Sequence, residues 1–229
     1  MRGLKLSKSV IIIGASGHGK VIADIAVRNG YDNIAFLDDN AAIRECAGFP
    51  VIGKTADANQ MDGDKIVAIG NPAIREHIQE TIPTVTLVHP DAVISRRVTL
   101  GEGTVVMAGA VINSDAVIGN GCIINTGASV DHDCRIGDFV HVSVGAHVAG
   151  TCNIGERTWI GAGATVGNNI TICGDCMIGA GAVVVKNITK EGTYIGVPAK
   201  EKEMSKHTPT GGGVLPRPSE HRACPACAA

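Results

Sequence analysis

Large aliphatic residues recur at every sixth position along the second half of the chain. The series is unbroken over seventeen positions of Ile, Leu or Val: Val88, Ile94, Leu100, Val106, Ile112, Ile118, Ile124, Val130, Ile136, Val142, Val148, Ile154, Ile160, Val166, Ile172, Ile178 and Val184. If about one residue in three were aliphatic, chance would give this series on the order of once in 10⁸ sequences. An internal hexapeptide repeat is therefore secure.

A period of six fits neither an α-helix nor a strand, whose side chains repeat every 3.6 and every 2 residues. It fits a chain that turns a corner every six residues and points one large aliphatic side chain at a central axis. Glycine marks a longer period of eighteen residues, which is three sides, at Gly101, Gly119, Gly137 and Gly155. The sequence therefore predicts a triangular coil of eighteen residues.

The position two residues before each aliphatic residue is mostly small. Its occupants include Thr104, Ala110, Ala116, Cys122, Ala128, Cys134, Ala146, Cys152, Thr158, Ala164, Cys176 and Ala182. Large and small residues that alternate toward the inside give the close packing that a narrow β-solenoid needs. We therefore predict a parallel β-helix of roughly five coils.

The beginning of the chain follows a different pattern, a βαβ unit with a glycine-rich first turn. Its expected parts are a strand at Lys8–Ile13, the turn Gly14–Gly19, a helix from Lys20 to about Asn29, a strand at Asn33–Leu37 and the acidic pair Asp38-Asp39. Such a turn lets backbone N–H groups approach a phosphate, and the carboxylates suit a ribose or a base. The glycine spacing is not the dinucleotide spacing, so a purely structural turn stays open as an alternative.

A further strand, at Lys65–Ile69, leads into a second helix that runs from Pro72 to about Thr81. Gly70 and Asn71 join the two, and we expect Asn71 to be the N-cap with Pro72 at the first helical position. We divide the chain into a small α/β domain at 1–84, a solenoid with a C-terminal cap at 85–201, and a Gly- and Pro-rich tail at 202–229, predicted to be disordered.

Composition excludes several classes of partner. The formal net charge is −2 without a basic cluster, which argues against nucleic acid and against an anionic membrane surface. The apolar run Val10–Ile13 is too short for a membrane span or a signal-peptide core, so we expect a cytoplasmic protein.

The cysteines fit the same expectation. Four of the eight occupy the small inward position, where a thiol acts as a small apolar group: Cys122, Cys134, Cys152 and Cys176. We therefore expect free thiols in a reducing compartment. Cys224 and Cys227 have metal-ligand spacing but no second pair nearby, so no metal is expected.

The most polar irregularity of the repeat runs from Asn125 to Asp133. Within it, His132 lies near a corner with a carboxylate on each side, and an imidazole beside a carboxylate is a suitable general base near neutral pH. His141 and His147 follow in outward positions, where a histidine is either solvated or at an interface. An ordinary surface role stays open for each of these histidines.

Aliphatic residues also occupy outward positions, at Val105, Val111, Val117 and Ile123. They share their place in the hexapeptide with His141. An apolar stripe on the outside of a solenoid predicts a packed partner surface, most simply another copy of the chain.

Together these motifs resemble a known family. They are Gly14-Ala-Ser-Gly-His-Gly19, Phe36-Leu-Asp-Asp39, Ala68-Ile-Gly-Asn71, Asp131-His-Asp-Cys134, His141-Val-Ser-Val-Gly145 and Gly196-Val-Pro-Ala-Lys200. The repeat resembles the left-handed β-helix of the hexapeptide acyltransferases. The motifs are similar to those of bacterial sugar-nucleotide acetyltransferases, including the UDP-4-amino-sugar N-acetyltransferases of bacillosamine synthesis and perosamine N-acetyltransferases. The resemblance covers roughly residues 8 to 200.

The resemblance implies the roles of the solenoid residues. His132 matches the general base and Asp133 the acid beside it, while Asn125 and His141 match residues that line the acetyl site. The cofactor-binding positions of acetyl-CoA are His141 together with Gly150, Ala162 and Ala180, and no metal is required. A backbone N–H near Gly150 is the expected oxyanion donor.

The resemblance also implies the substrate site and the assembly. The expected nucleotide-sugar contacts are Ser16, Gly17, His18, Asp38, Asp39, Gly70 and Asn71. Family members are homotrimers with each active site between two subunits, which agrees with the apolar stripe.

The implied activity is acetyl-CoA-dependent N-acetylation of a nucleotide-linked 4-amino-4,6-dideoxy sugar, UDP-linked in preference to GDP-linked, for bacterial glycan synthesis. O-acetylation of sialic acid or another sugar is an alternative. A non-catalytic solenoid for assembly or nucleotide sensing is an alternative of another class. A zinc-dependent γ-type carbonic anhydrase does not fit, because the spacings of nine and six residues between His132, His141 and His147 differ from the spacings of that family.

Overall fold

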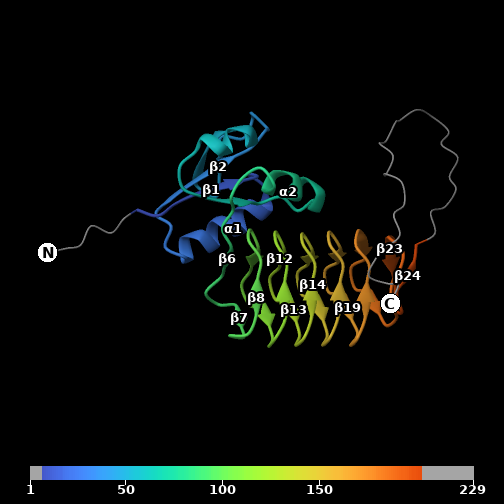
Figure 1. Ribbon diagram of the computed structural model, residues 1–229. Helices are drawn as coiled ribbons and strands as arrows, with labels where there is room; N and C mark the ends of the chain where they lie inside the picture. Colours follow the sequence, from blue (N-terminus) through green and yellow to red (C-terminus); the bar gives the residue numbers. More distant parts are fainter. Residues whose placement is uncertain (1–6, 203–229) are drawn as a thin grey trace, which may run out of the picture.

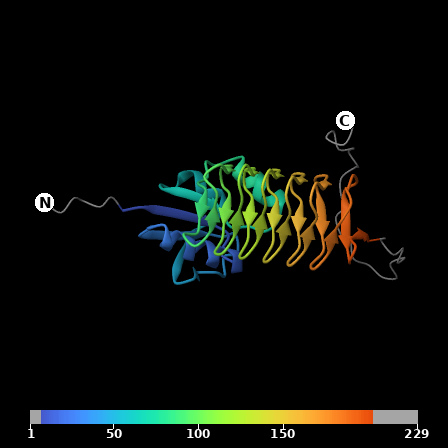
Figure 2. The same ribbon diagram turned by 90° about the horizontal axis from the view of Figure 1, so that it is seen from below.

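The chain forms a small α/β unit followed by a long three-sided solenoid (Figure 1). The computed structural model describes residues 7–202. The α/β unit lies beside the first coils, and the coils nearest the C-terminal end extend beyond it (Figures 1 and 2). This arrangement combines the two patterns that the sequence predicts.

The α/β unit is built on one five-stranded sheet with the strand order β3-β4-β2-β1-β5. Its elements are β1 (Ser9–Ile13), α1 (Gly17–Arg28), β2 (Asn33–Leu37), β3 (Glu45–Cys46), β4 (Phe49–Gly53), the 3-10 helix η1 (Thr55–Gln60), β5 (Asp64–Val67) and α2 (Pro72–Gln79). Strands β1, β2, β4 and β5 run parallel, and β3 pairs with β4 as an antiparallel hairpin. The carboxyl ends of β1, β2 and β5 therefore meet at one edge, where open α/β sheets bind their ligands.

The predicted elements of this unit are confirmed, with shifted ends. Helix α1 begins at Gly17 instead of Lys20, because the last residues of the glycine-rich segment already form its first turn. Strand β5 ends at Val67, two residues before the predicted end. The β3–β4 hairpin and η1 lie in a segment whose pattern predicted neither.

Three parallel sheets make the sides of the solenoid. Their strands are β6 (Leu87–Val88), β7 (Val93–Ile94), β8 (Thr99–Leu100), β9 (Val105–Val106), β10 (Val111–Ile112), β11 (Val117–Ile118), β12 (Ile123–Ile124), β13 (Ser129–Val130), β14 (Arg135–Ile136), β15 (His141–Val142), β16 (His147–Val148), β17 (Asn153–Ile154), β18 (Trp159–Ile160), β19 (Thr165–Val166), β20 (Thr171–Ile172), β21 (Cys176–Ile178), β22 (Val183–Val184), β23 (Gly192–Ile195) and β24 (Lys200–Glu201). Residues eighteen apart pair, as Ile123 does with His141, and His141 with Trp159. The predicted coil of eighteen residues is confirmed.

We name the sides after their central strands. The β15 side carries β6, β9, β12, β15, β18, β21, β23 and β24; the β13 side carries β7, β10, β13, β16, β19 and β22; and the β14 side carries β8, β11, β14, β17 and β20. The chain visits the β15, β13 and β14 sides in that order in each coil. Each corner of the solenoid is therefore identified by the two sides that meet there.

The solenoid core consists of the two inward positions. Ile112, Ile118 and Ile124 are at most 1% exposed, and the cysteines at 122 and 134 are fully buried as free thiols. The glycines of the eighteen-residue period are required by the stacking, since a Cβ on Gly119 would lie 2.8 Å from the carbonyl carbon of Gly137 in the next coil. Coils approach most closely at these glycines.

The α/β unit packs on the β15 side. Val105, Met107 and Ile123 belong to the same apolar cluster as residues of β1 and α1. The predicted partner stripe is therefore wrong in part, because Val105 and Ile123 are only 1% exposed within a single chain. Val111 and Val117 lie on the other two sides. A period of six residues does not say which of three sides a residue occupies, so the four residues do not form one stripe.

The last described strands close the end of the solenoid. Strand β23 pairs with β21 in parallel, and β24 turns back antiparallel to β23. The predicted disordered tail, with Cys224 and Cys227, lies outside the described residues. Neither α1 nor α2, the α-helices of the described chain, is long and apolar enough to cross a membrane.

Candidate functional site

The glycine-rich turn joins β1 to α1 at the carboxyl edge of the sheet. A Cβ on Gly14, whose φ is +110°, would lie 2.8 Å from the carbonyl oxygen of Ala68, and a Cβ on Gly19 would lie 3.0 Å from the Phe36 ring. Packing therefore requires glycine at both positions. Around Gly17, by contrast, no heavy atom lies within 4 Å of a would-be Cβ. The backbone at Gly17, the first residue of α1, is open to a ligand.

The two aspartates after β2 serve this turn differently. One carboxylate oxygen of Asp38 accepts a hydrogen bond from the Ala15 N–H at 2.8 Å, and the other accepts one from the Asn40 N–H at 2.8 Å. Asp38 therefore orders the glycine-rich turn directly. Asp39 is exposed and accepts a hydrogen bond from the Thr55 N–H at 3.0 Å.

The loop after β5 leads to the solenoid surface. Asn71 is the N-cap of α2, accepting a hydrogen bond from the Ile74 N–H at 3.1 Å, and Pro72 occupies the first turn, as predicted. A Cβ on Gly70 would lie 3.7 Å from the Trp159 ring. This loop therefore faces the β15 side, where Trp159 packs on His141 with 4.4 Å between ring centroids.

His141 points outward, as predicted, but it is neither solvated nor free. It is 7% exposed, and its Nε2 lies 3.0 Å from Asn125 Nδ2. Asn125 Oδ1 already accepts a hydrogen bond from the Thr126 N–H, so Asn125 Nδ2 must be the donor to His141. The proton of a neutral His141 consequently sits on Nδ1, a buried atom for which the described residues offer no hydrogen-bond partner.

His141 stays neutral at physiological pH. Burial, followed by the positive charge of Arg75 and by His18, lowers the pKa of His141 to about 3. Burial and Arg75 likewise lower the pKa of His18 to about 4. The His18 Nε2 and the Ser143 hydroxyl are also buried without a partner among residues 7–202. Unsatisfied buried polar atoms are rare, so these three groups are free to bind a polar ligand.

His132 forms the second chemical centre, at the corner between the β13 and β14 sides. Its Nδ1 lies 2.8 Å from Asp133 Oδ2, and both side chains are more than half exposed. Asp131 caps the corner, with its Oδ1 accepting hydrogen bonds from Asn113 Nδ2 and from the His132 N–H. The Asp133 hydrogen bond and then the Asp131 charge raise the pKa of His132.

The other nitrogen of His132 remains available. Gly150 lies at the same corner of the next coil, and a Cβ there would lie 2.7 Å from His132 Nε2, so a larger residue at 150 would displace the His132 ring. The expected oxyanion donor at this position is already engaged, because the Gly150 N–H donates to Asn168 Oδ1 at 3.1 Å. Asn168 and Trp159 are residues that sequence reasoning missed, and both lie one coil, eighteen residues, beyond a residue that it found.

One chain separates the predicted site residues into two groups. The corner that carries His132 and Gly150 lies opposite the β15 side, which carries His141 and the α/β unit. Asn125, Ala162 and Ala180 lie at the corner between the β15 and β13 sides, so Gly150 is not in line with the other two cofactor positions. His147 points outward from the β13 side, with its Nδ1 2.9 Å from Ser129 Oγ.

Two families match parts of this chain. The PglD N-terminal domain family matches residues 9–82, and the bacterial transferase hexapeptide family matches residues 151–186. The first match covers the α/β unit and the second covers two coils of the solenoid.

Within residues 7–202, no three His, Cys, Asp or Glu side chains gather as a metal site would require.

Two solved structures cover nearly the whole described chain. The acetyltransferase domain of PglB from Neisseria gonorrhoeae is 42% identical, with a TM-score of 0.82 over 86% of this chain and 100% of that one. This domain has also been solved in complex with acetyl coenzyme A. PerB from Caulobacter crescentus, in complex with CoA and GDP-perosamine, is 39% identical, with a TM-score of 0.80 over 85% of this chain and 97% of that one.

A curated relative matches over a shorter stretch. The UDP-N-acetylbacillosamine N-acetyltransferase of Bacillus subtilis is 37% identical over 109 residues, which are 43% of this chain and 50% of that protein. The matched part thus spans about half the length of this relative. The two domains, their order and structural matches over about 85% of the chain show that it belongs to the hexapeptide-repeat, left-handed β-helix sugar acetyltransferases that carry a PglD-type N-terminal domain.

Proposed function

We propose that this chain transfers the acetyl group of acetyl-CoA to the 4-amino group of a nucleotide-linked 4-amino-4,6-dideoxy sugar, UDP-linked in preference to GDP-linked. The observation that carries the proposal is the His132–Asp133 pair, which leaves His132 Nε2 available at an exposed corner. The ligands of two relatives support it, acetyl coenzyme A in the Neisseria domain and CoA with GDP-perosamine in PerB. The product would serve bacterial glycan synthesis.

The proposed chemistry is direct acyl transfer. The sugar nitrogen attacks the thioester carbonyl carbon, the carbon–sulfur bond breaks, and CoA leaves as a thiolate. His132 Nε2 accepts the proton that the nitrogen loses, while Asp133 holds the Nδ1 proton and the ring orientation. No enzyme-bound acyl group is needed, because an amine is a competent nucleophile.

We assign stabilisation of the oxyanion to His141 in place of Gly150. Among residues 7–202, the Nδ1–H of a neutral His141 has no acceptor, and Asn125 holds the ring in place at the other nitrogen. The Ser143 hydroxyl, two residues further on, is a second buried group that can donate. A preorganised donor in a buried site stabilises developing negative charge more strongly than the same donor in water.

The nucleotide sugar is assigned to the carboxyl edge of the α/β sheet, where the glycine-rich turn leads into α1 at Gly17. The backbone N–H groups there lie at the positive end of the α1 dipole, a favourable place for a diphosphate. We assign Ser16, Gly17 and His18 to the diphosphate and sugar, and Asp38 and Asp39 to the base and ribose. The Gly70–Asn71 loop is assigned to the sugar. The pantetheine arm of acetyl-CoA is assigned to Ala162 and Ala180 of one copy of the chain and to Gly150 of a neighbouring copy, because one chain places Gly150 at a different corner.

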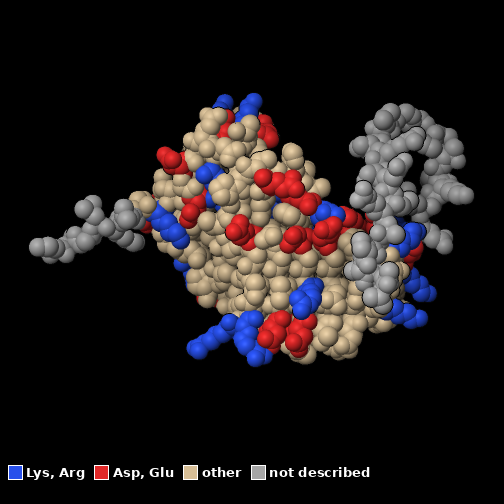
Figure 3. All heavy atoms as spheres, in the orientation of Figure 1, with Lys and Arg blue, Asp and Glu red and all other residues tan. Residues whose placement is uncertain are grey.

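We propose that a second copy of the chain completes each site, in a homotrimer. A single chain holds His132 opposite the side that carries His141 and the α/β unit, so a neighbour must supply the base. A broad band of uncharged atoms crosses the solenoid below the α/β unit and offers contact surface (Figure 3). In a trimer with threefold symmetry, the His132 corner of each chain meets the His141 side of the next chain, so three equal sites form.

Mixing two inactive variants tests this arrangement. His132→Ala chains and His141→Ala chains, unfolded together and refolded as mixed oligomers, should regain about a quarter of the active sites, since one site in four pairs an intact His132 with an intact neighbouring His141. Acetyl transfer by the mixture is compared with each variant refolded alone. Mixed oligomers as inactive as the separate variants would contradict a site shared between copies.

The pH dependence of the reaction should report Asp133. Since the base must be neutral to accept a proton, kcat falls as pH decreases through the pKa of His132, which Asp133 raises above the ordinary histidine value. Asp133→Asn should therefore move the acidic limb of the kcat profile to lower pH and lower the plateau. Asp131→Asn, the matched variant, should shift the limb less. Equal shifts in both variants would contradict the assigned partner of His132.

The activity itself is tested by thiol release from acetyl-CoA with UDP-, GDP- and dTDP-linked 4-amino-4,6-dideoxy sugars. Fast release with one sugar, and an acetamido product in its mass spectrum, is the expected result. Release with sialic acid and with none of the amino sugars would favour O-acetylation. Binding of nucleotide sugars without thiol release would favour a non-catalytic solenoid.

The six free cysteines of the described chain agree with the proposed cytoplasmic location.

A further inference from the structure

Arg75 on helix α2 is a buried cation held by backbone carbonyls. It is 1% exposed, yet none of the carboxylates in residues 7–202 forms an ion pair with it. Its Nε donates to the Gly121 carbonyl at 2.7 Å and its Nη2 to the Phe139 carbonyl at 2.6 Å. Its Nη1 donates to the carbonyls of Ile69 and Gly70 at 2.8 and 2.9 Å. One guanidinium thus joins three separate segments.

The segments that Arg75 joins belong to the two halves of the proposed site. Ile69 and Gly70 form the loop that faces Trp159. Gly121 lies two residues before β12, which leads to Asn125, and Phe139 lies two residues before His141. Arg75 therefore links the loop of the nucleotide-sugar edge directly to the coils that hold the acetyl site.

Arg75 does more than fill the space beneath α2. An apolar side chain of similar volume would leave the four backbone carbonyls that Arg75 binds without this donor. Only a planar guanidinium offers five N–H donors in fixed directions, and such a fork sets distances and angles between the groups that it binds. Burial lowers the pKa of Arg75 to about 10, so it remains charged at neutral pH.

We propose that Arg75 is a positioning residue, which fixes the 69–70 loop against the coils of Asn125 and His141 and so aligns the sugar-nucleotide site with the acetyl site. This inference rests on the proposed function. The coils are held by their own strand pairing, so the loop is the part that shifts when Arg75 is changed. The acetyl-CoA site should consequently stay intact.

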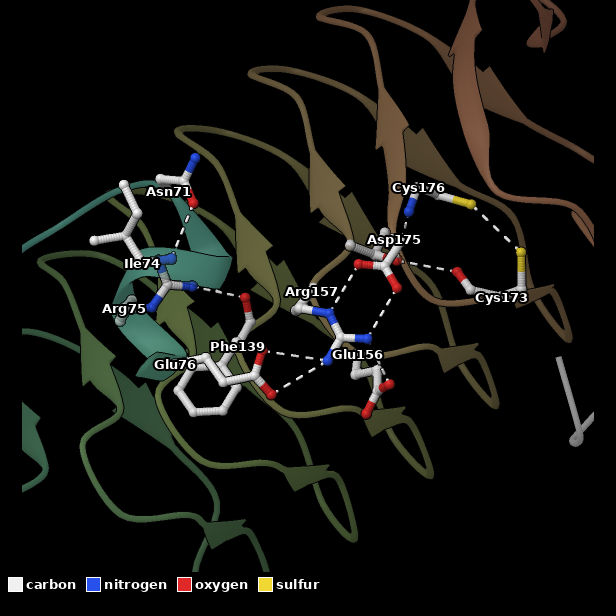
Figure 4. Close-up of polar contacts among 11 residues, drawn as sticks. Asn71, Ile74, Arg75, Glu76, Phe139, Glu156, Arg157, Cys173, Asp175 and Cys176 are labelled. Atoms are coloured by element: carbon white, nitrogen blue, oxygen red, sulfur yellow. Dashed lines mark hydrogen bonds and ion pairs between the residues drawn. The ribbon is translucent and has the colours of Figure 1, made fainter. Parts of the chain in front are cut away.

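The neighbouring Glu76 provides a matched control. It docks the same helix on the solenoid through Arg157, whose Nη1 lies 3.2 Å from Glu76 Oε1 (Figure 4). The carbonyls of the 69–70 loop are bound by Arg75 instead. Arg157 also binds Glu156 and Asp175, so it keeps two partners when Glu76 is removed. Glu76→Gln therefore weakens docking and leaves the loop contacts in place.

The test compares Arg75→Lys and Glu76→Gln with the parent protein. Lysine keeps the charge but loses the fork, so Arg75→Lys should lower kcat/KM for the amino sugar by roughly 10²-fold, with KM for acetyl-CoA within about threefold. Backbone amides of residues 69–74 should exchange hydrogen about tenfold faster. Glu76→Gln should keep kcat/KM within about threefold and leave that exchange unchanged.

Three results would overturn the inference. The first is an unchanged kcat/KM in Arg75→Lys. The second is a Glu76→Gln protein that loses as much kcat/KM as Arg75→Lys when the two variants have the same fall in Tm. The third is unchanged amide exchange at residues 69–74 in Arg75→Lys. If the parent transfers acetyl to none of the sugars, the proposed function fails instead. The amide exchange of the two variants still decides the role of Arg75 in that case.

Discussion

His132→Ala is expected to lower kcat by roughly 10²–10⁴-fold, because it removes the group to which the proposed mechanism assigns the proton of the attacking nitrogen. The side chain lies at an exposed corner and contacts Asp133 only through an exposed hydrogen bond. The variant should therefore keep the Tm of the parent. Thiol release from acetyl-CoA, at saturating amino sugar, measures the loss.

His147→Ala is the control for this prediction. His147 is also exposed, and it bonds Ser129 on the β13 side, away from the corner of His132. Its replacement should leave kcat within about threefold of the parent value. Full activity of His132→Ala, or an equal loss in His147→Ala, would remove His132 from the role of base.

Ile118→Ala should produce the largest loss of stability, about 2–5 kcal/mol in the free energy of unfolding. Ile118 points to the solenoid axis and is 1% exposed, and its neighbours are held at coil spacing by backbone hydrogen bonds. The core therefore cannot collapse around the missing methylenes. In a stack of repeats, each coil contacts only its neighbours, so a cavity in a middle coil weakens both adjoining interfaces.

Val117→Ala provides the comparison, because Val117 precedes Ile118 in the same strand but points outward and is 36% exposed. Its replacement should cost less than about 1 kcal/mol. Urea unfolding of both variants at one protein concentration measures the difference. Equal losses would mean that the inward and outward positions of the repeat are assigned wrongly.

The repeat could be predicted from the sequence because its signal is local. Each hexapeptide carries its own large inward residue and its own small one, and the Cβ clash at Gly119 explains the glycine period. The Asn71 cap of α2 and the His132–Asp133 hydrogen bond are likewise contacts between residues at most three positions apart. Such contacts form within a short segment, so they do not depend on where the rest of the chain packs.

The surroundings of His141 could not be predicted from the sequence. Its outward direction was predicted correctly. Its burial was not, because Trp159 of the next coil packs on its ring, and Arg75 and His18 of the α/β unit contribute to its lowered pKa. The same unit covers Val105 and Ile123, which the pattern assigned to a partner surface. An outward position in a repeat states a direction only, and what covers it depends on elements elsewhere in the chain.

The sequence by itself therefore determined the solenoid, its coil length, the α/β unit and the presence of a carboxylate on each side of His132. The tertiary structure alone decided that Arg75 would reach Gly121 and Phe139, which lie 46 and 64 residues away. It also decided that Asn168 would accept a hydrogen bond from the Gly150 N–H, and that His132 would lie at the corner opposite the side of His141. The physical reason is that periodicity records contacts within a coil and between stacked coils, whereas docking of one domain on another depends on shapes and hydrogen-bond partners that no local pattern contains.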